Sequence, residues 1–254
     1  MDPRTVAAAA LSAALVASAP DARVPVAKCD KHLDTFNVPA ETVFALVKTI
    51  ALTQVSIEPT LSDSVRDRGR VAIDSDAAQE LRGAGFTVVP PALVDSVWRH
   101  TVDSVGPMFD PRTGQADSTK VAGARAALVA SLRAGYSADA LLYLQVRLVN
   151  AEFEKWTATW DGTEESWGNF GHRFMGGLLH GTYKGRTNAL TLFATLMTTT
   201  GRRLYDGKGG LQVYLLPDNG KFVNRPDSVF FVDTARSAHS VHLALCGLVT
   251  RTGT

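Results

Sequence analysis

The sequence predicts an α/β domain with an α+β tendency, in which helices pack on a mixed sheet of about five strands. Three observations predict this fold class. Strand-like and helix-like segments alternate over residues 49–134, which is typical of βαβ units. Residues 140–153 show a two-residue hydrophobic period, which indicates a long strand. Residues 199–201 (TTG) separate two further apolar segments and predict a C-terminal antiparallel hairpin.

The individual elements follow from local composition. The expected strands are rich in β-branched and aliphatic residues and are bounded by turn residues. They cover residues 49–57, 86–89, 140–153, 187–197 and 203–205, and residues 211–216 extend the last of these strands. The expected helices carry apolar residues at helical spacing, and they cover residues 74–83, 91–106, 118–134 and 228–249. The polar residues 62–70 and the Pro- and Gly-containing residues 109–117 are expected to be loops.

The amino-terminal residues determine the expected compartment. Arg4 precedes an unbroken run of apolar and small residues over positions 6–16, and Ala17-Ser18-Ala19 supplies an A-x-A cleavage site. Residues 1–22 are therefore predicted to be a signal peptide, and residues 23–254 a single periplasmic or secreted domain. The run is shorter than the about 20 apolar residues of a membrane-spanning helix, and no later segment reaches that length. No membrane span is expected; the alternative for these residues is an Ala-rich extension.

The two cysteines, Cys29 and Cys246, lie near opposite ends of the mature chain. An even number of cysteines in an oxidising compartment favours a disulfide between them. Such a bond would stabilise the fold by up to about 5 kcal/mol in the chain-entropy model. The alternative is a lipidated Cys29, but residues 26–28 (VAK) lack the leucine and the small neighbour that lipoprotein processing requires. A lipid anchor is therefore not expected.

Charge and motif content exclude several function classes. The formal net charge of +1 comes from 26 basic and 25 acidic residues that are scattered along the chain, without the basic stripe of nucleic-acid-binding proteins. The chain contains no G-x-S-x-G, H-E-x-x-H or G-x-x-x-x-G-K-[ST] motif. Residues 206–210 (DGKGG) open no helix, so we expect a turn there and not a phosphate site. We expect no nucleic-acid partner, no cofactor and a non-catalytic role.

Four phrases of the sequence occur in an informative order: IALTQV at 50–55, FTVVPP at 86–91, SADALLYLQVRL at 137–148 and TLMTTTGRRLYDGKGG at 195–210. In this order the chain resembles the small envelope α/β domains of the TolB amino-terminal and curli-secretion lipoprotein type. The resemblance covers residues 49–216. It implies βαβα units with a short antiparallel hairpin, and a domain that docks other envelope proteins or self-associates, without catalysis.

A Gly-rich insertion at about residues 161–185 departs from that pattern. Large apolar side chains on or beside such an insertion are typical of interface anchors. The expected interaction residues are Trp160, Trp167, Phe170, Phe174 and Met175. A loop packed on its own domain is the alternative interpretation.

A second hypothesis for the insertion is a secreted metal-dependent hydrolase. His172 and His180 lie near Asp161, Glu164 and Glu165, so histidine and carboxylate groups could converge for metal binding or proton transfer.

A further possible set of metal ligands lies on the expected C-terminal helix. His239, His242 and Cys246 share one helical face. A structural metal site normally has four ligands, so we expect these side chains to pack or to cap.

Overall fold

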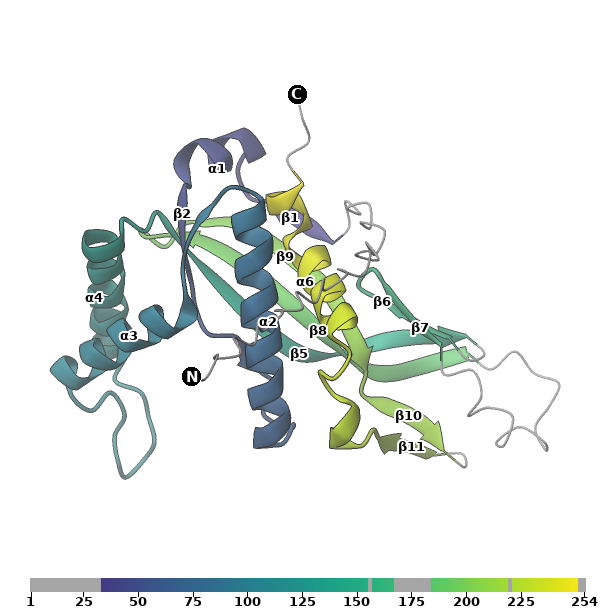
Figure 1. Cartoon of the computed structure of the whole chain (residues 1–254). Coiled ribbons are helices and arrows are strands. Elements are labelled where there is room, and N and C mark those ends of the chain that lie inside the picture. The colour runs from purple at the N-terminus through teal and green to yellow at the C-terminus, as the bar shows by residue number, and fades with distance from the viewer. Residues whose placement is uncertain (1–32, 155–156, 167–183, 219–220, 251–254) are drawn as a thin grey trace, which may run out of the picture.

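A nine-stranded mixed sheet forms the centre of the molecule, and helices cover parts of both of its faces (Figure 1). The structure is a computed structural model that describes residues 33–154, 157–166, 184–218 and 221–250. The sheet contains β1 (Asp34–Phe36), β2 (Thr49–Leu52), β3 (Ser56–Ile57), β4 (Thr87–Val89), β5 (Ala140–Glu154), β6 (Thr157–Trp160), β7 (Thr163–Ser166), β8 (Lys184–Thr198) and β9 (Arg203–Val213). A separate two-stranded sheet consists of β10 (Leu215–Asp218) and β11 (Lys221–Asn224). The helices are α1 (Ala40–Leu46), α2 (Asp63–Gly83), α3 (Pro91–Val105), α4 (Ser118–Tyr136) and α6 (Thr234–Val249), with a 3-10 helix η1 (Asp227–Val229).

The strand order confirms the predicted α/β class with a mixed sheet and a C-terminal hairpin. The main row is β1-β9-β8-β5-β2-β4, while β3 and β6 pair with β5 and β7 pairs with β6. β2 is parallel to β4 and β5, whereas β5, β8 and β9 are antiparallel neighbours. The sheet has nine strands in place of the expected five, because the first predicted strand is divided into β2 and β3, and β1, β6 and β7 were not expected.

Two glycines of β9 explain why the expected turn at residues 206–210 is wrong. These residues lie inside β9, and α6 crosses directly over them. A Cβ atom at Gly207 would lie 2.0 Å from the Ala244 carbonyl oxygen, and one at Gly209 would lie 2.2 Å from that of Ser240. The Ser240 hydroxyl also donates to the Gly209 carbonyl at 2.8 Å. The glycines therefore permit close packing of a helix on a strand.

Helix α2 is longer than predicted, and the expected loop at residues 62–70 is wrong. The helix begins at Asp63, and its buried side includes Val65, Gly69, Ile73, Ala77 and Leu81 at a constant spacing of four. Most other residues of this helix are polar, so the buried residues at this spacing are difficult to recognise in the sequence.

Asp74, the first residue of the predicted helix, lies in the interior of α2. Its carboxylate accepts a hydrogen bond from the Val55 amide at 3.0 Å. Burial raises the pKa of Asp74 to about 6, although this hydrogen bond and the nearby Arg70 oppose the shift.

The C-terminal helix begins later than expected. Residues 227–229 form η1, and α6 starts at Thr234, where the Asp233 side chain caps the Arg236 amide. Val232, which lies inside the predicted helix, precedes α6 and is 60% exposed. The buried residues of α6 extend over two sides of the helix, since it packs on both β9 and α2.

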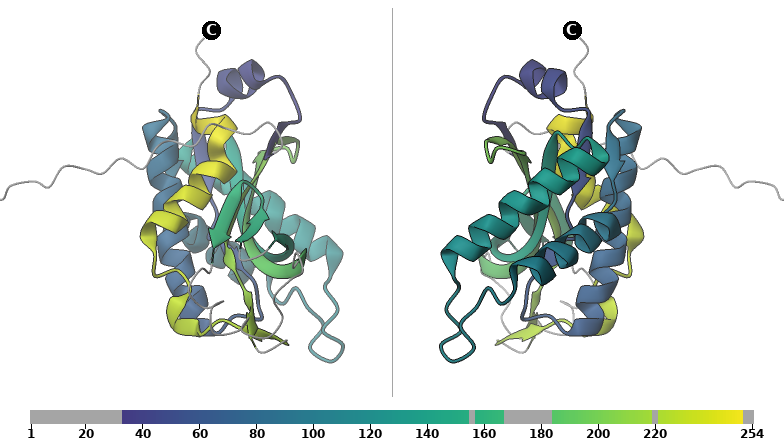
Figure 2. Two further views of the ribbon diagram at one scale, coloured as in Figure 1. Left: turned by 90° about the vertical axis from the view of Figure 1, so that its right-hand side faces the viewer. Right: turned by 90° about the vertical axis from the view of Figure 1, so that its left-hand side faces the viewer.

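The helices form two unequal layers. Figure 2 shows α2 and α6 on one side of the sheet and α3 and α4 on the other. The α2–α6 layer covers a large core cluster that includes residues of β2, β5, β8 and β9. The α3–α4 layer packs mainly on β2, β4 and the beginning of β5, through Leu128, Leu132 and Leu141 among others. Across the described ranges, no helix combines the length and the apolar composition that crossing a bilayer requires.

Candidate functional site

Trp160 is buried, so it is not the exposed interface anchor that was expected. Its side chain is 7% exposed and packs with Ala158, Ala189 and Val213. The indole Nε1 donates a hydrogen bond to the Leu190 carbonyl at 3.1 Å. The β6–β7 hairpin therefore folds back onto the sheet and buries the tryptophan.

The other residues predicted for the insertion lie outside the described part of the chain. These are Trp167, Phe170, His172, Phe174, Met175 and His180. Their roles as interaction or metal-binding residues stay predictions. Cys29 also lies outside the described residues, so its pairing with Cys246 stays a prediction as well.

Two of the acidic residues next to the insertion stabilise the β6–β7 hairpin. Asp161 lies 2.6 Å from Lys208 Nζ and accepts a hydrogen bond from the Thr191 hydroxyl at 2.8 Å. Glu165 is buried and contacts Arg225 at 2.5 Å and Arg236 at 2.8 Å.

These contacts also set the charge state of Glu165. Burial opposes its ionisation, but the Val213 amide and the two arginines together hold the pKa of this carboxyl below its usual value. Both Asp161 and Glu165 are thus engaged in ion pairs within the fold.

The histidines of α6 take part in side-chain packing. His242 Nδ1 lies 3.4 Å from Glu80 Oε2 on α2, and its Nε2 lies 3.9 Å from Cys246 Sγ. Burial and the neighbouring His242 lower the pKa of His239. Among the residues that the structure describes, no group of three or more His, Cys, Asp and Glu side chains could hold a metal ion.

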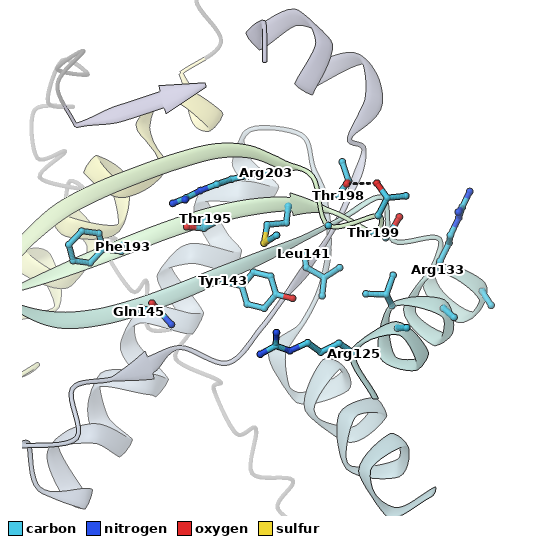
Figure 3. Close-up of a pocket in the computed structure, with 17 residues that line it drawn as sticks. Arg125, Arg133, Leu141, Tyr143, Gln145, Phe193, Thr195, Thr198, Thr199 and Arg203 are labelled. Atoms are coloured by element: carbon cyan, nitrogen blue, oxygen red, sulfur yellow. Dashed lines mark hydrogen bonds between the residues drawn. The ribbon is translucent and has the colours of Figure 1, made fainter. Parts of the chain in front are cut away.

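A groove of about 1200 Å³ lies between α4 and the adjoining face of β5, β8 and β9 (Figure 3). We call it the α4 groove. Its floor follows the strand register: Leu141 pairs with Met197, Tyr143 with Thr195, and Gln145 with Phe193. The α4 side of the groove consists of Arg125, Ala126, Val129, Ala130, Arg133 and Ala134.

The groove combines apolar walls with basic side chains. Arg125 and Arg133 are exposed, and neither side chain has an ion pair or hydrogen bond with another described residue. Arg203, on the opposite side, donates from Nε to Asp206 at 2.6 Å. None of the described residues that line the groove is acidic. The site therefore favours an anionic partner with an apolar surface.

Tyr143 contributes a hydroxyl group to the same site. Figure 3 shows Arg125 extending from α4 toward the strands below Tyr143. Burial raises the pKa of the Tyr143 phenol, while the charge of Arg125 opposes this shift. The phenol is consequently a neutral hydrogen-bond donor at physiological pH.

Sequence reasoning missed this groove, although one signal for it was present. On β8, Leu192, Ala194 and Leu196 face the core, so the alternating positions would be expected to be polar. Phe193 and Met197 occupy such alternating positions and are only partly buried. Apolar residues on both faces of a strand indicate that each face meets another surface.

The fold and the groove together define the class of protein: a mixed α/β domain with an open, basic groove on one face of its sheet. No protein-family model and no curated protein sequence matches the chain. Among solved structures, the chain is similar to the lipoprotein GNA1162 from Neisseria meningitidis, with a TM-score of 0.32 and 16% identity over 72% of this chain and 89% of that chain. A match at this TM-score carries no conclusion about fold or function.

Proposed function

We propose that this chain is an exported, non-catalytic protein that binds a partner protein in the α4 groove. The observation that carries the proposal is the pair Arg125 and Arg133, which stand beside an apolar floor without a counter-charge among the described residues. Phe193 and Met197 add apolar surface that an interface would bury. An acidic, partly apolar partner would complement both features.

The chemistry of the lining supports binding over catalysis. The described residues that line the groove supply arginine, tyrosine, threonine and glutamine side chains, with no carboxylate, imidazole or thiol. Imidazole is the most common proton-transfer group of enzymes, and carboxylates and thiols serve as further proton-transfer groups or nucleophiles.

The proposed export rests on the predicted signal peptide at residues 1–22. The resemblance in element order to TolB amino-terminal and curli-secretion lipoprotein domains, which dock envelope proteins, supports the same kind of role. The intact mass of the protein recovered from the producing cells tests this part: loss of the leader is expected, and a retained leader would contradict export.

Site-specific photocrosslinking in the producing cells tests the binding role. A photoreactive amino acid at Thr200, at the exposed edge of the groove, should form a discrete adduct. The matched control is Val71, which is 74% exposed on α2, the helix on the opposite face of the sheet, and it should form none. Combining the Thr200 probe with Arg125→Glu and Arg133→Glu should remove the adduct. An unchanged adduct, or none in either background, would contradict binding in the groove.

A further inference from the structure

We infer that the occupant of the α4 groove is an amphipathic α-helix of a partner protein, with acidic residues two turns apart on the flank that faces α4. This inference rests on the proposed function and specifies the chemistry of the partner. It follows from the space above the sheet, the shape of the α4 wall and the position of the charges.

The first argument is an incomplete helical layer. On the core face, α6 packs on β8 and β9. On the other face, α3 and α4 pack on β2, β4 and Leu141 of β5, and no described helix covers Thr195 or Phe193 of β8. The β6–β7 turn bounds this open area at its far end, where Asp161 contacts Lys208 and Thr191. An additional helix beside α4 would complete the layer.

The second argument is the shape of the α4 wall. Ala126, Ala130 and Ala134 are spaced by four residues, so they lie one above the other on the side of α4 that lines the groove. Helices pack at interaxial distances of about 8 to 10 Å, and the shorter distances require small side chains at the contact. The alanines thus permit a second helix to approach closely.

The third argument is the position of the two arginines. Arg125 and Arg133 are eight residues apart, which corresponds to about 12 Å along α4. Acidic residues seven or eight positions apart on a neighbouring helix have nearly the same separation, so both ion pairs can form at once. This spacing determines the register of the partner helix.

The floor of the groove favours a helix over an acyl chain. Leu141, Phe193 and Met197 alternate with the polar Gln145 and Thr195. A helix surface carries both apolar and polar side chains and can match this alternation. The Thr195 hydroxyl already donates to Asp206 Oδ1 at 2.9 Å, and the Gln145 side-chain oxygen accepts from Arg147. An acyl chain would cover the Gln145 amide nitrogen without accepting a hydrogen bond from it, which is unfavourable.

The test uses two synthetic peptides with the same Leu/Ala face, each stapled to hold it helical. One carries glutamates at positions i and i+7, and the other carries lysines there. Fluorescence anisotropy with the full mature chain should show the glutamate peptide binding roughly tenfold more tightly than the lysine peptide, since two attractive contacts become repulsive. The difference should decrease at high salt.

Charge exchange provides the decisive control. The Arg125→Glu, Arg133→Glu variant should reverse the preference and bind the lysine peptide. Arg112→Glu, which makes the same kind of charge change in the exposed loop before α4, should bind as the wild type does. Ala130→Trp, which fills the groove from an exposed position, should lose both peptides.

Other outcomes would overturn the inference in distinct ways. If neither peptide binds while the Thr200 photocrosslink persists, the groove binds a partner but that partner is not such a helix. Equal binding of both peptides would refute the role of the arginines. Tighter binding to phosphatidylglycerol vesicles than to the glutamate peptide would identify an anionic lipid. A concentration-dependent dimer that the double charge variant abolishes would identify a second copy of the chain.

Discussion

The two faces of β8 are covered to very different extents. On the core face, Leu190, Leu192 and Leu196 are fully buried beneath the α2–α6 layer. On the groove face, Phe193 and Met197 are only partly buried, next to a helical layer that stops at α4. The comparison shows that one face of a strand can be fully covered by helices while its other face stays partly open.

The largest effect is expected where a helix touches the core face of the sheet. Gly207→Val would place side-chain atoms against the Ala244 backbone. Its Cβ atom alone would lie 2.0 Å from the Ala244 carbonyl oxygen. Because α6 and β9 would have to separate, the free energy of unfolding should fall by more than about 4 kcal/mol, as measured by urea denaturation. Gly83→Ala, where no atom lies within 4 Å of the added Cβ, should change it little. Equal stability of the Gly207 variant would mean that α6 does not pack closely on β9.

A pair of adjacent substitutions compares the two faces directly. Leu192→Ala removes a fully buried side chain and should cost about 3 kcal/mol of unfolding free energy. Phe193→Ala, on the partly exposed face, should lower the free energy of unfolding by only about 1 kcal/mol, but it should weaken binding of the glutamate peptide. Urea denaturation and peptide anisotropy on both variants check this. The reverse ranking of stabilities would contradict the assignment of the two faces.

The pH dependence of stability should arise in part from the core face. The pKa of Asp74 is raised from 3.8 to about 6 in the folded protein, so the folded state binds the proton more readily than the unfolded state. The favourable contribution of Asp74 to the free energy of unfolding is therefore fully present below pH 3.8 and is lost as the pH rises through about 6.

Asp74→Asn removes this titration and can still accept the Val55 hydrogen bond. From pH 4 to pH 7, the free energy of unfolding of the variant should rise by about 1 kcal/mol relative to that of the wild type, after allowance for partial exposure of the carboxyl. Denaturation curves at the two pH values measure the difference. A constant difference would show that Asp74 does not titrate in this range.

The smallest effect is expected in the last turn of α4, at a residue that does not line the groove. Gly135→Ala adds a methyl group in open space within a helix and should raise the free energy of unfolding by about 0.5 to 1 kcal/mol. Peptide affinity should stay unchanged, because Gly135 does not line the groove. A loss of affinity in this variant would indicate that the groove extends past the end of α4.

Much of the fold could be predicted from local patterns. The alternation along β5, the hairpin turn at residues 199–201 and the apolar spacing of α4 all indicate elements that the structure contains. The errors occur where local composition conflicts with long-range packing. Residues 62–70 are polar, but most of them belong to α2, which packs against α6. Residues 206–210 resemble a turn, but they lie within β9, which also packs against α6.

The candidate site was much less predictable. Trp160 was expected on the surface and is buried by the fold of the β6–β7 hairpin. No sequence motif singles out Arg125 and Arg133, whereas in the structure they line a groove with residues of β5, β8 and β9. The strands that complete this groove lie far from α4 in the sequence.

By itself, the sequence determined the fold class, the long strand β5, the helices α3 and α4 and the presence of a leader-like N-terminal run, because side-chain periodicity and composition act locally. Only the tertiary structure decided which strand faces are covered, why the glycines of β9 are needed and where basic and apolar side chains converge. The physical reason is that coverage of a sheet depends on how many helices the chain connections place on each face. The number of helices on each face depends on contacts between distant parts of the chain, so it cannot be predicted from the hydrophobic pattern of one segment.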